Sequence, residues 1–404
     1  MERRSDAGMT RTGLLLAVYL PAALLLFGQG ILLTTLPLYA KSFDVSLGWV
    51  GLAVAAAAIG TMLMDVPAGA VVGLLGQRPA MVLGSALVMA STFALGFGHN
   101  FVLLVLLRIA AGVGTALWAL SRHALLARGV AVARRGRAVS IYGGVNRIGT
   151  FAGPLAGGLI GKAYGLQESF FAVSVLAAAA LILSLAFVRS EPVPAKRLEH
   201  RARWSVVLHL LRKGRRELAA AGGAQIFAQM IRAGRQFLIP IYGATILGLD
   251  AAQIGVIMTS AAVLDMLLFL PVGVTMDRFG RKVATVPSFV VMAAGVALIP
   301  LTSSYLGLLL ASLVIGFGNG LGSGTMMTLG ADLAPAGATG EFLGLWRLVG
   351  DAGSVGGPLV VGGLAGVAGL RGSAFVLAAI GITAALMFAF LVRETRRAPL
   401  DAMT

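Results

Sequence analysis

Twelve long apolar stretches follow one another along the chain and are separated by short polar segments. Each stretch has about 20 to 30 residues, enough to cross a hydrocarbon core of roughly 30 Å as a helix. The pattern therefore predicts twelve membrane-spanning helices. In the first half we expect helices at 13–40, 47–73, 80–98, 101–125, 138–162 and 167–188. In the second half we expect helices at 218–247, 252–276, 284–302, 305–331, 340–366 and 372–392.

The second half of the chain repeats short patterns of the first half at one spacing. Gly153 and Pro154 recur 204 residues later as Gly357 and Pro358. Two other patterns recur after 204 residues, 67–69 at 271–273 and 112–114 at 316–318, and 36–39 recurs after 203 residues at 239–242. Several matches at one period indicate a duplicated unit. We therefore expect an N-terminal six-helix bundle (1–188), a linker (189–217) and a C-terminal six-helix bundle (218–404).

The composition agrees with a membrane location. Hydrophobic residues make up 58% of the 404 residues, charged residues only 12%, and the mean hydropathy is +0.91. A soluble fold could not cover that much apolar surface. We predict an all-α polytopic membrane protein with twelve transmembrane helices in two pseudo-symmetric bundles.

The net charge is +16, and the positions of the positive residues along the chain indicate which side of the membrane each loop lies on. Of the 32 Lys and Arg residues, only Lys41, Lys162 and Arg371 fall in segments on the side opposite the two chain ends. Because positive residues collect in cytoplasmic loops, we expect both termini in the cytoplasm. We expect no nucleic-acid partner. The polar start, 1–13, shows no cleavage site for a removable signal peptide.

The sequence shows no residue pattern typical of an enzyme or a metal site. It has no cysteine, and its four histidines lie at loops or helix ends, away from acid clusters. No nucleophile–base set, phosphate loop or dinucleotide fingerprint appears. We expect no enzymatic activity, no metal and no cofactor.

Residues 140–161 combine an apolar helix with many glycines. Gly149, Gly153, Gly157 and Gly161 recur every four residues and form one bare face for close helix packing. Pro154 removes a backbone donor and bends the helix beside this face. Because residues 347–363 carry a second copy, we expect both segments to control how the halves close.

Three motifs resemble those of the major facilitator superfamily. Residues 149–158 match Gly-x-x-x-Gly-Pro-x-x-Gly-Gly, a signature associated with the family's proton-driven exporters. Residues 108–116 read Arg-x-x-x-Gly-x-Gly-x-Ala, similar to the fourth-helix motif, although Ala111 replaces the usual glutamine. Residues 273–282 resemble the cytoplasmic loop motif, whose defining positions are Gly273, Asp277, Arg278, Gly280 and Arg281. The equivalent loop at 69–78 keeps the glycines but lacks the aspartate and first arginine.

The resemblance to the family's 12-helix drug:proton antiporter group implies a secondary transporter. It implies proton-coupled efflux of small amphiphilic compounds by alternating access, from a monomer in the bacterial inner membrane. The proton gradient would be the driving force, and no bound cofactor is implied. An organic-anion or a sugar or metabolite transporter stays open as an alternative, and so does a non-transporting receptor or scaffold.

The loop motif also has a physical interpretation. The carboxylate of Asp277 can face the positive N-terminal end of a neighbouring helix, and we expect that helix to begin near Ser140. Arg278, Arg281 and Lys282 can pair with acids or with lipid phosphates. We expect this contact to stabilise one of two arrangements of the halves.

Eight ionisable residues fall at membrane depth, where charge is costly and so indicates function or pairing. The acids are Asp65, Asp265 and Asp351, and the bases are Arg108, Arg147, Arg232, Arg235 and Arg347. In the superfamily, helices 2 and 11 meet across the halves, as do helices 5 and 8. We therefore predict two ion pairs between the halves, Asp65 with Arg347 and Asp265 with Arg147. We expect them to hold the cytoplasmic side shut; the alternative is static pairs within one half.

Proton coupling needs a carboxyl group whose surroundings change between states. Asp65, Asp265 and Asp351 are the candidates, in that order, and Arg108 is assigned to helix packing or proton relay. For the substrate cavity we expect Gln29, Asn146, Arg232 and Arg235, because helices 1 and 7 line it in this family. Five bases against three acids make an anionic substrate an open alternative.

Overall fold

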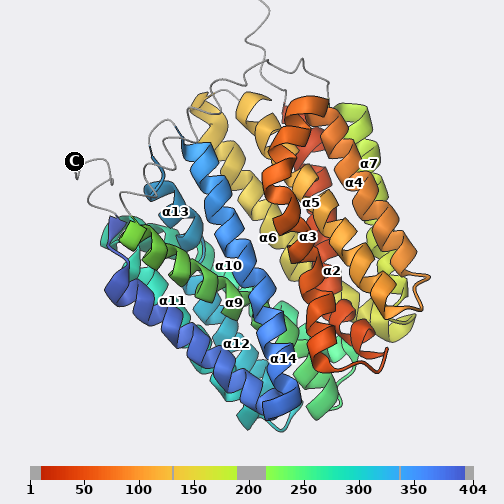
Figure 1. The fold of residues 1–404 in the computed structure, drawn as a ribbon, viewed down its shortest axis with the longest axis vertical. Helices are drawn as coiled ribbons and strands as arrows, with labels where there is room; N and C mark the ends of the chain where they lie inside the picture. Colours follow the sequence, from red (N-terminus) through yellow and green to blue (C-terminus); the bar gives the residue numbers. More distant parts are fainter. Residues whose placement is uncertain (1–10, 130–131, 189–214, 336–337, 396–404) are drawn as a thin grey trace, which may run out of the picture.

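The computed structural model describes residues 11–129, 132–188, 215–335 and 338–395. Within these ranges the chain is helical and has no strand, and it forms two bundles side by side (Figure 1). The N-terminal bundle runs from red to yellow-green in Figure 1, and the C-terminal bundle from green to blue. Of the linker predicted at 189–217, residues 189–214 lie outside the described ranges.

The N-terminal bundle comprises the elements from α1 to α7. Its first transmembrane segment runs without interruption through α1 (Arg11–Leu14), the π-helical η1 (Leu15–Tyr19) and α2 (Leu20–Lys41). The remaining elements are α3 (Leu47–Leu75), α4 (Gln77–Leu95), α5 (Phe101–Gly129), α6 (Val132–Ala163) and α7 (Glu168–Phe187).

The C-terminal bundle repeats this order. It contains α9 (Arg215–Ile246), α10 (Ala251–Phe279), α11 (Lys282–Leu298), the short 3-10 turn η2 (Ile299–Leu301), α12 (Tyr305–Leu321), α13 (Thr325–Asp332), α14 (Thr339–Leu386) and the π-helical η3 (Met387–Leu391).

The helices of the described ranges account for the predicted spans. Nine helices there are long and apolar enough to cross a membrane by length and composition. The glycine-rich α6 and the arginine-bearing α9 are not among these nine helices. Each nevertheless packs within its bundle as one of the helices that the sequence predicts. One of the nine, α14, contains two predicted helices, because the chain turns at Gly369 (φ 67°) while both flanking segments stay helical.

Two details of the predicted helices need correction. The helix expected at 138–162 begins at Val132, so Ser140 lies inside α6 and offers no helix N-terminus for Asp277 to face. The helix expected at 305–331 is broken between α12 and α13. Gly324 there has a positive φ of 80°, a left-handed conformation that glycine adopts without a steric penalty.

The glycine face of α6 packs against α2. A side chain at Gly153 would overlap the backbone of Gly30, and one at Gly157 would overlap the backbone of Ile31. At Gly149 it would meet the backbone at Phe27. Close contact of the two helix backbones therefore depends on these glycines, as the small-residue pattern predicts.

The two bundles meet along two helix pairs, α3 with α14 and α6 with α10. In the second pair, the Thr259 hydroxyl of α10 enters the backbone ladder of α6 beside Pro154. It donates to the Phe151 carbonyl at 3.0 Å and accepts from the Leu155 N–H at 3.0 Å. A side chain of one bundle thus satisfies the backbone at the bend of the other, a known way to hold a helix kink.

The ends of the bundles differ in how closely the halves approach. We call the end where α7 ends and α9 begins the linker end, and the end where α2 ends and α3 begins the distal end. At the distal end, Lys162 pairs with Asp250 at 2.9 Å, and Lys41 donates to the Thr245 hydroxyl at 2.9 Å. A side chain at Gly362 of α14 would overlap the Leu47 carbonyl of α3. The distal end is therefore closed.

At the linker end, the described glycines of these helices have open space beside them. On the four helices that join the halves, a side chain added at any of seven glycines there would meet no described atom within 4 Å; these are Gly69, Gly73, Gly143, Gly144, Gly273, Gly340 and Gly344. At these seven described positions the helices leave open space beside their backbones, whereas at the distal end the halves are in direct contact. This is the arrangement of one of two alternating states.

Candidate transport cavity

A cavity of about 730 Å³ lies between the bundles. One part of its wall is apolar and is formed by α2, α3 and α7, for example by Leu33, Val54 and Val173. The other part is polar and carries six arginines, Arg108, Arg122, Arg147, Arg232, Arg235 and Arg347. Asp351 is the single acid in the described lining. The cavity therefore combines an apolar wall with a strongly cationic one.

The first charge cluster joins α3 to α14. Arg347 contacts Asp65 across the halves (Nη2 to Oδ1, 3.2 Å) and Asp351 within its own helix (Nε to Oδ2, 3.6 Å). The two carboxyl groups also lie within hydrogen-bonding reach of each other. Their Oδ2 atoms are buried and receive no hydrogen bond. Two carboxylates therefore share one guanidinium.

The second cluster joins α6 to α10. Arg147 contacts Asp265 (Nη1 to Oδ1, 3.4 Å) and its guanidinium stacks on the Phe269 ring, 4.1 Å from the centroid. Asp265 also accepts hydrogen bonds from Asn319 at 2.7 Å and from Ser323 at 2.8 Å. Three donors thus satisfy this carboxylate, in contrast to Asp65 and Asp351.

Arg232 belongs to the same polar network. Its Nε donates to the Asn319 side chain at 3.1 Å, and its Nη2 donates to the Gly322 carbonyl at 3.2 Å. That carbonyl lies at the helix break between α12 and α13, where it also accepts from the backbone N–H of Thr325 at 3.2 Å and from its hydroxyl at 2.7 Å. The break therefore anchors Arg232 at the cavity wall.

Both ion pairs that the sequence predicts between the halves are present. At 1.5 Å rise per residue, the pair of Asp65 and Arg347 lies about 12–15 Å from the linker ends of α3 and α14, and the pair of Arg147 and Asp265 lies about 21–23 Å from those of α6 and α10. The described glycines beyond them, toward the linker end, have open space where a side chain would be added. That these pairs hold the cytoplasmic side shut stays a prediction.

The structure places three of the four predicted cavity residues in the lining of the cavity. Gln29, Arg232 and Arg235 line the cavity, and so does Arg108, which was assigned to packing or proton relay. The side chain of Asn146 lies outside the described residues. The sequence analysis missed Arg122, Asn319, Ser323 and Thr259. Of these four, only Arg122 could have been found from the sequence, because it is a charged residue near the end of an apolar stretch.

A model of the Major Facilitator Superfamily matches residues 18–231 and 221–402, which together cover nearly the whole described chain. The chain belongs to this superfamily. As a member it is a multi-pass membrane transporter of a small-molecule substrate and not an enzyme.

Individual relatives are distant. The chain is 20% identical over 324 residues to an uncharacterized MFS-type transporter of Methanocaldococcus jannaschii, covering 80% of this chain and 83% of the relative. It is 29% identical over 186 residues to the multidrug resistance protein Stp of Mycobacterium tuberculosis, covering 45% of this chain and 34% of Stp. The crystal structure of a D-xylose-proton symporter has the same fold, with a TM-score of 0.78 at 19% identity, covering 95% of this chain and 98% of that one.

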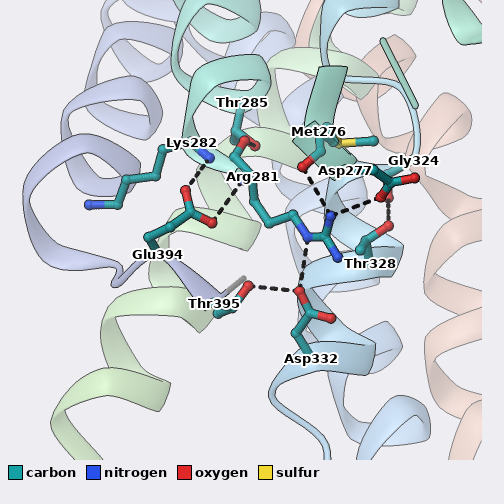
Figure 2. A network of polar contacts seen from close by, with 10 residues as sticks. All are labelled: Met276, Asp277, Arg281, Lys282, Thr285, Gly324, Thr328, Asp332, Glu394 and Thr395. Atoms are coloured by element: carbon teal, nitrogen blue, oxygen red, sulfur yellow. Dashed lines mark hydrogen bonds and ion pairs between the residues drawn. The ribbon is translucent and has the colours of Figure 1, made fainter. Parts of the chain in front are cut away.

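The loop motif of this superfamily member forms a network at the linker end of the C-terminal bundle (Figure 2). Arg281 donates to Asp332 at the end of α13 (3.0 Å) and to Asp277 (3.2 Å). The backbone N–H groups of Arg281 and Lys282 donate to Glu394 at 2.8 and 3.0 Å. Glu394 thus caps the start of α11, and the network ties α10, α11, α13 and the chain after η3 together.

Asp277 and Glu394 differ in what they contribute to this network. The Asp277 side chain is 80% exposed and pairs with Arg281 one helical turn away, whereas Glu394 satisfies two backbone donors. We expect Glu394→Ala to destabilise the protein by about 1–3 kcal/mol, because two N–H groups lose a charged acceptor. Asp277→Ala is expected to change stability by less than about 1 kcal/mol, as for an exposed ion pair. Thermal unfolding in detergent compares the two, and equal shifts would contradict this assignment.

At the distal end, Asp250 caps α10 through a reciprocal pair of hydrogen bonds with Gln253, 2.8 and 3.0 Å long. The Gln253 N–H lowers the pKa of the Asp250 carboxyl, and Lys162 lowers it further. The pKa of this carboxyl is lower in the folded protein than in the unfolded chain. Its ionised form therefore stabilises the fold fully at pH values above the unfolded-state pKa, and this stabilisation is lost as the pH falls through the folded-state pKa. Asp250 therefore stays ionised at neutral pH and keeps its ion pair with Lys162.

Proposed function

We propose that this protein is a proton-coupled exporter of small amphiphilic compounds that works by alternating access. We place it in a bacterial inner membrane, with both termini in the cytoplasm. The cluster of Asp65, Arg347 and Asp351 is the observation that carries the proposal. It lies at membrane depth, it joins the two halves, and it contains more carboxylates than its arginine can neutralise.

The charge of this cluster changes with one proton. With both acids ionised, two carboxylates and one guanidinium carry a net charge of −1. One proton shared between the two carboxyl groups makes the cluster neutral and adds a hydrogen-bond donor to it.

Proton uptake can bias the arrangement of the halves. Arg347 is held by Asp65 from the other bundle and by Asp351 from its own helix. A proton shared between Asp65 of α3 and Asp351 of α14 removes the repulsion between their carboxylates and adds a hydrogen bond between the halves, so the attraction between α3 and α14 differs between the protonated and the ionised cluster. A ligand shifts a conformational equilibrium by its difference in affinity for the two states, and the proton is such a ligand here.

The cavity and the relatives support an amphiphilic cargo and export. The apolar wall formed by α2, α3 and α7 suits a hydrophobic body, and the arginine-bearing wall suits a polar group. Stp, which the chain resembles over 186 residues, is named for multidrug resistance. A sugar is less suited to the apolar wall. A non-transporting receptor would have no use for a proton-binding cluster between movable halves.

Flux into liposomes of known orientation tests the proposal. Purified protein is reconstituted, a pH gradient is imposed, and uptake of aromatic cations, neutral compounds and anions is followed. We expect at least one class to accumulate against its own gradient only when the pH gradient is present. Equal flux with and without the gradient would contradict proton coupling, and no flux of any class would favour the receptor.

A further inference from the structure

Two of the six cavity arginines have no partner in the described part of the chain. Arg147 and Arg347 contact aspartates, Arg232 contacts Asn319 and Gly322, and Arg122 stacks on Trp118. Arg108 of α5 and Arg235 of α9 make no such contact, and their Nε atoms are buried without an acceptor. Both line the cavity, one from each bundle.

An unpaired arginine at membrane depth is costly, because nothing compensates its lost hydration. Asp265, a carboxylate on the C-terminal side of the cavity, already receives hydrogen bonds from Arg147, Asn319 and Ser323. Asp65 and Asp351 are engaged by Arg347. The three acids at membrane depth are therefore engaged by other side chains. Asp265 attracts Arg235 from a distance, but neither Arg108 nor Arg235 contacts a carboxylate of the described structure directly.

Helix packing gives no reason for a guanidinium at position 108. The contact of α5 with α3 depends on glycines, since a side chain at Gly112 would overlap the Ala57 carbonyl and one at Gly60 would overlap the Ile109 carbonyl. The repeat places Ser312 at the position 204 residues after Arg108, so the duplicated fold does not need an arginine there. Proton relay and the binding of an anionic ligand are the two roles left for this guanidinium.

We propose that Arg108 and Arg235 together bind the anionic group of the substrate, which makes the cargo an amphiphilic organic anion such as an aromatic carboxylate. The inference rests on the proposed transport function and names its substrate class. A carboxylate fits because a guanidinium offers it two parallel N–H donors. One arginine from each bundle also means that a bound anion contacts both halves, as alternating access requires of a central site.

The apolar wall accommodates the rest of such a molecule. Leu25, Leu32, Val54 and Val173 line the cavity together with Arg108. An aromatic body on these side chains removes apolar surface from water on both partners. The volume of about 730 Å³ is within the range of pockets for drug-sized ligands.

Equilibrium binding of three matched probes tests the inference. The probes are 1-naphthoate, 1-naphthamide and 1-naphthylmethylammonium, which share one apolar body and differ in charge. Binding is measured by calorimetry to the full chain in nanodiscs of phosphatidylcholine, without a pH gradient. We expect 1-naphthoate to bind about tenfold or more tightly than the other two, since a charge-assisted bidentate contact is lost with either.

Variants of the two arginines locate the binding. Arg108→Gln and Arg235→Gln are each expected to raise the Kd of 1-naphthoate about tenfold and to leave that of 1-naphthamide unchanged. Arg108→Lys and Arg235→Lys keep the charge and should restore part of the preference, which a misfolded protein would not do. Arg371→Gln, at an exposed position outside the cavity lining, is the control for net charge and should change nothing.

The outcomes separate this inference from proton coupling. Equal binding of all three probes, preference for the cation, no binding of 1-naphthoate, or a preference that survives both glutamine variants would each overturn it. Proton-driven flux of cations would then still stand. Conversely, arginine-dependent binding of 1-naphthoate without any pH-driven flux would support the anion site and reject proton coupling.

Discussion

Replacing Asp351 with asparagine is expected to abolish the response of transport to a pH gradient. Asparagine has the shape of a protonated aspartate but cannot bind or release a proton. Flux driven by the pH gradient should therefore fall about tenfold or more, whereas exchange of labelled substrate across liposomes at equal pH should continue. Asp65→Asn should have the same effect, because the two carboxyl groups share one arginine.

A double variant and a matched control sharpen this experiment. Residues that act as one unit are not additive, so Asp65→Asn with Asp351→Asn should be no worse than either alone. Asp44→Asn is the control, at an exposed position whose positive φ of 53° asparagine adopts as readily as aspartate. Full pH-driven flux in Asp351→Asn would reject the cluster as the proton site.

Replacing Gly362 with alanine is expected to open the distal end. The added methyl group would overlap the Leu47 carbonyl of α3 only while the halves are packed there. Overpacking of this kind costs about 1–3 kcal/mol. Because the cost falls on one state alone, the equilibrium should shift about tenfold or more toward the state with a parted distal end.

The neighbouring glycine provides the control. A side chain at Gly363 would meet no atom within 4 Å, so Gly363→Ala should leave the equilibrium unchanged. Spin labels on cysteines at Ser46 and Val367 report the distance across the distal end, and the chain has no cysteine of its own to interfere. Equal distance distributions in Gly362→Ala and Gly363→Ala would show that this contact does not govern closure.

Much of the fold followed from periodicity. Twelve apolar stretches, a repeat of 204 residues and recurring glycine–proline pairs are long-range patterns that survive local irregularity. The two ion pairs between the halves were also predictable. An acid and a base on helices expected to meet, at equal depth in a medium that penalises single charges, have few other partners.

The features that could not be predicted are local. The break between α12 and α13 arises from a left-handed Gly324, and a glycine in an apolar helix usually causes no break. The Thr259 hydroxyl enters the α6 ladder only because the two helices cross there, and a threonine carries no sequence signal for that. Glu394 caps α11 from about a hundred residues away in the chain, a contact set by tertiary packing.

The most direct test of alternating access measures both ends of one protein. Spin labels at Gly73 and Gly340 report the linker end, and labels at Ser46 and Val367 report the distal end. We predict that lowering the pH, which protonates the cluster of Asp65 and Asp351, changes the two distances in opposite directions, and that Asp351→Asn abolishes this response. Distances that change in the same direction, or that do not respond to pH at either end, would contradict the account.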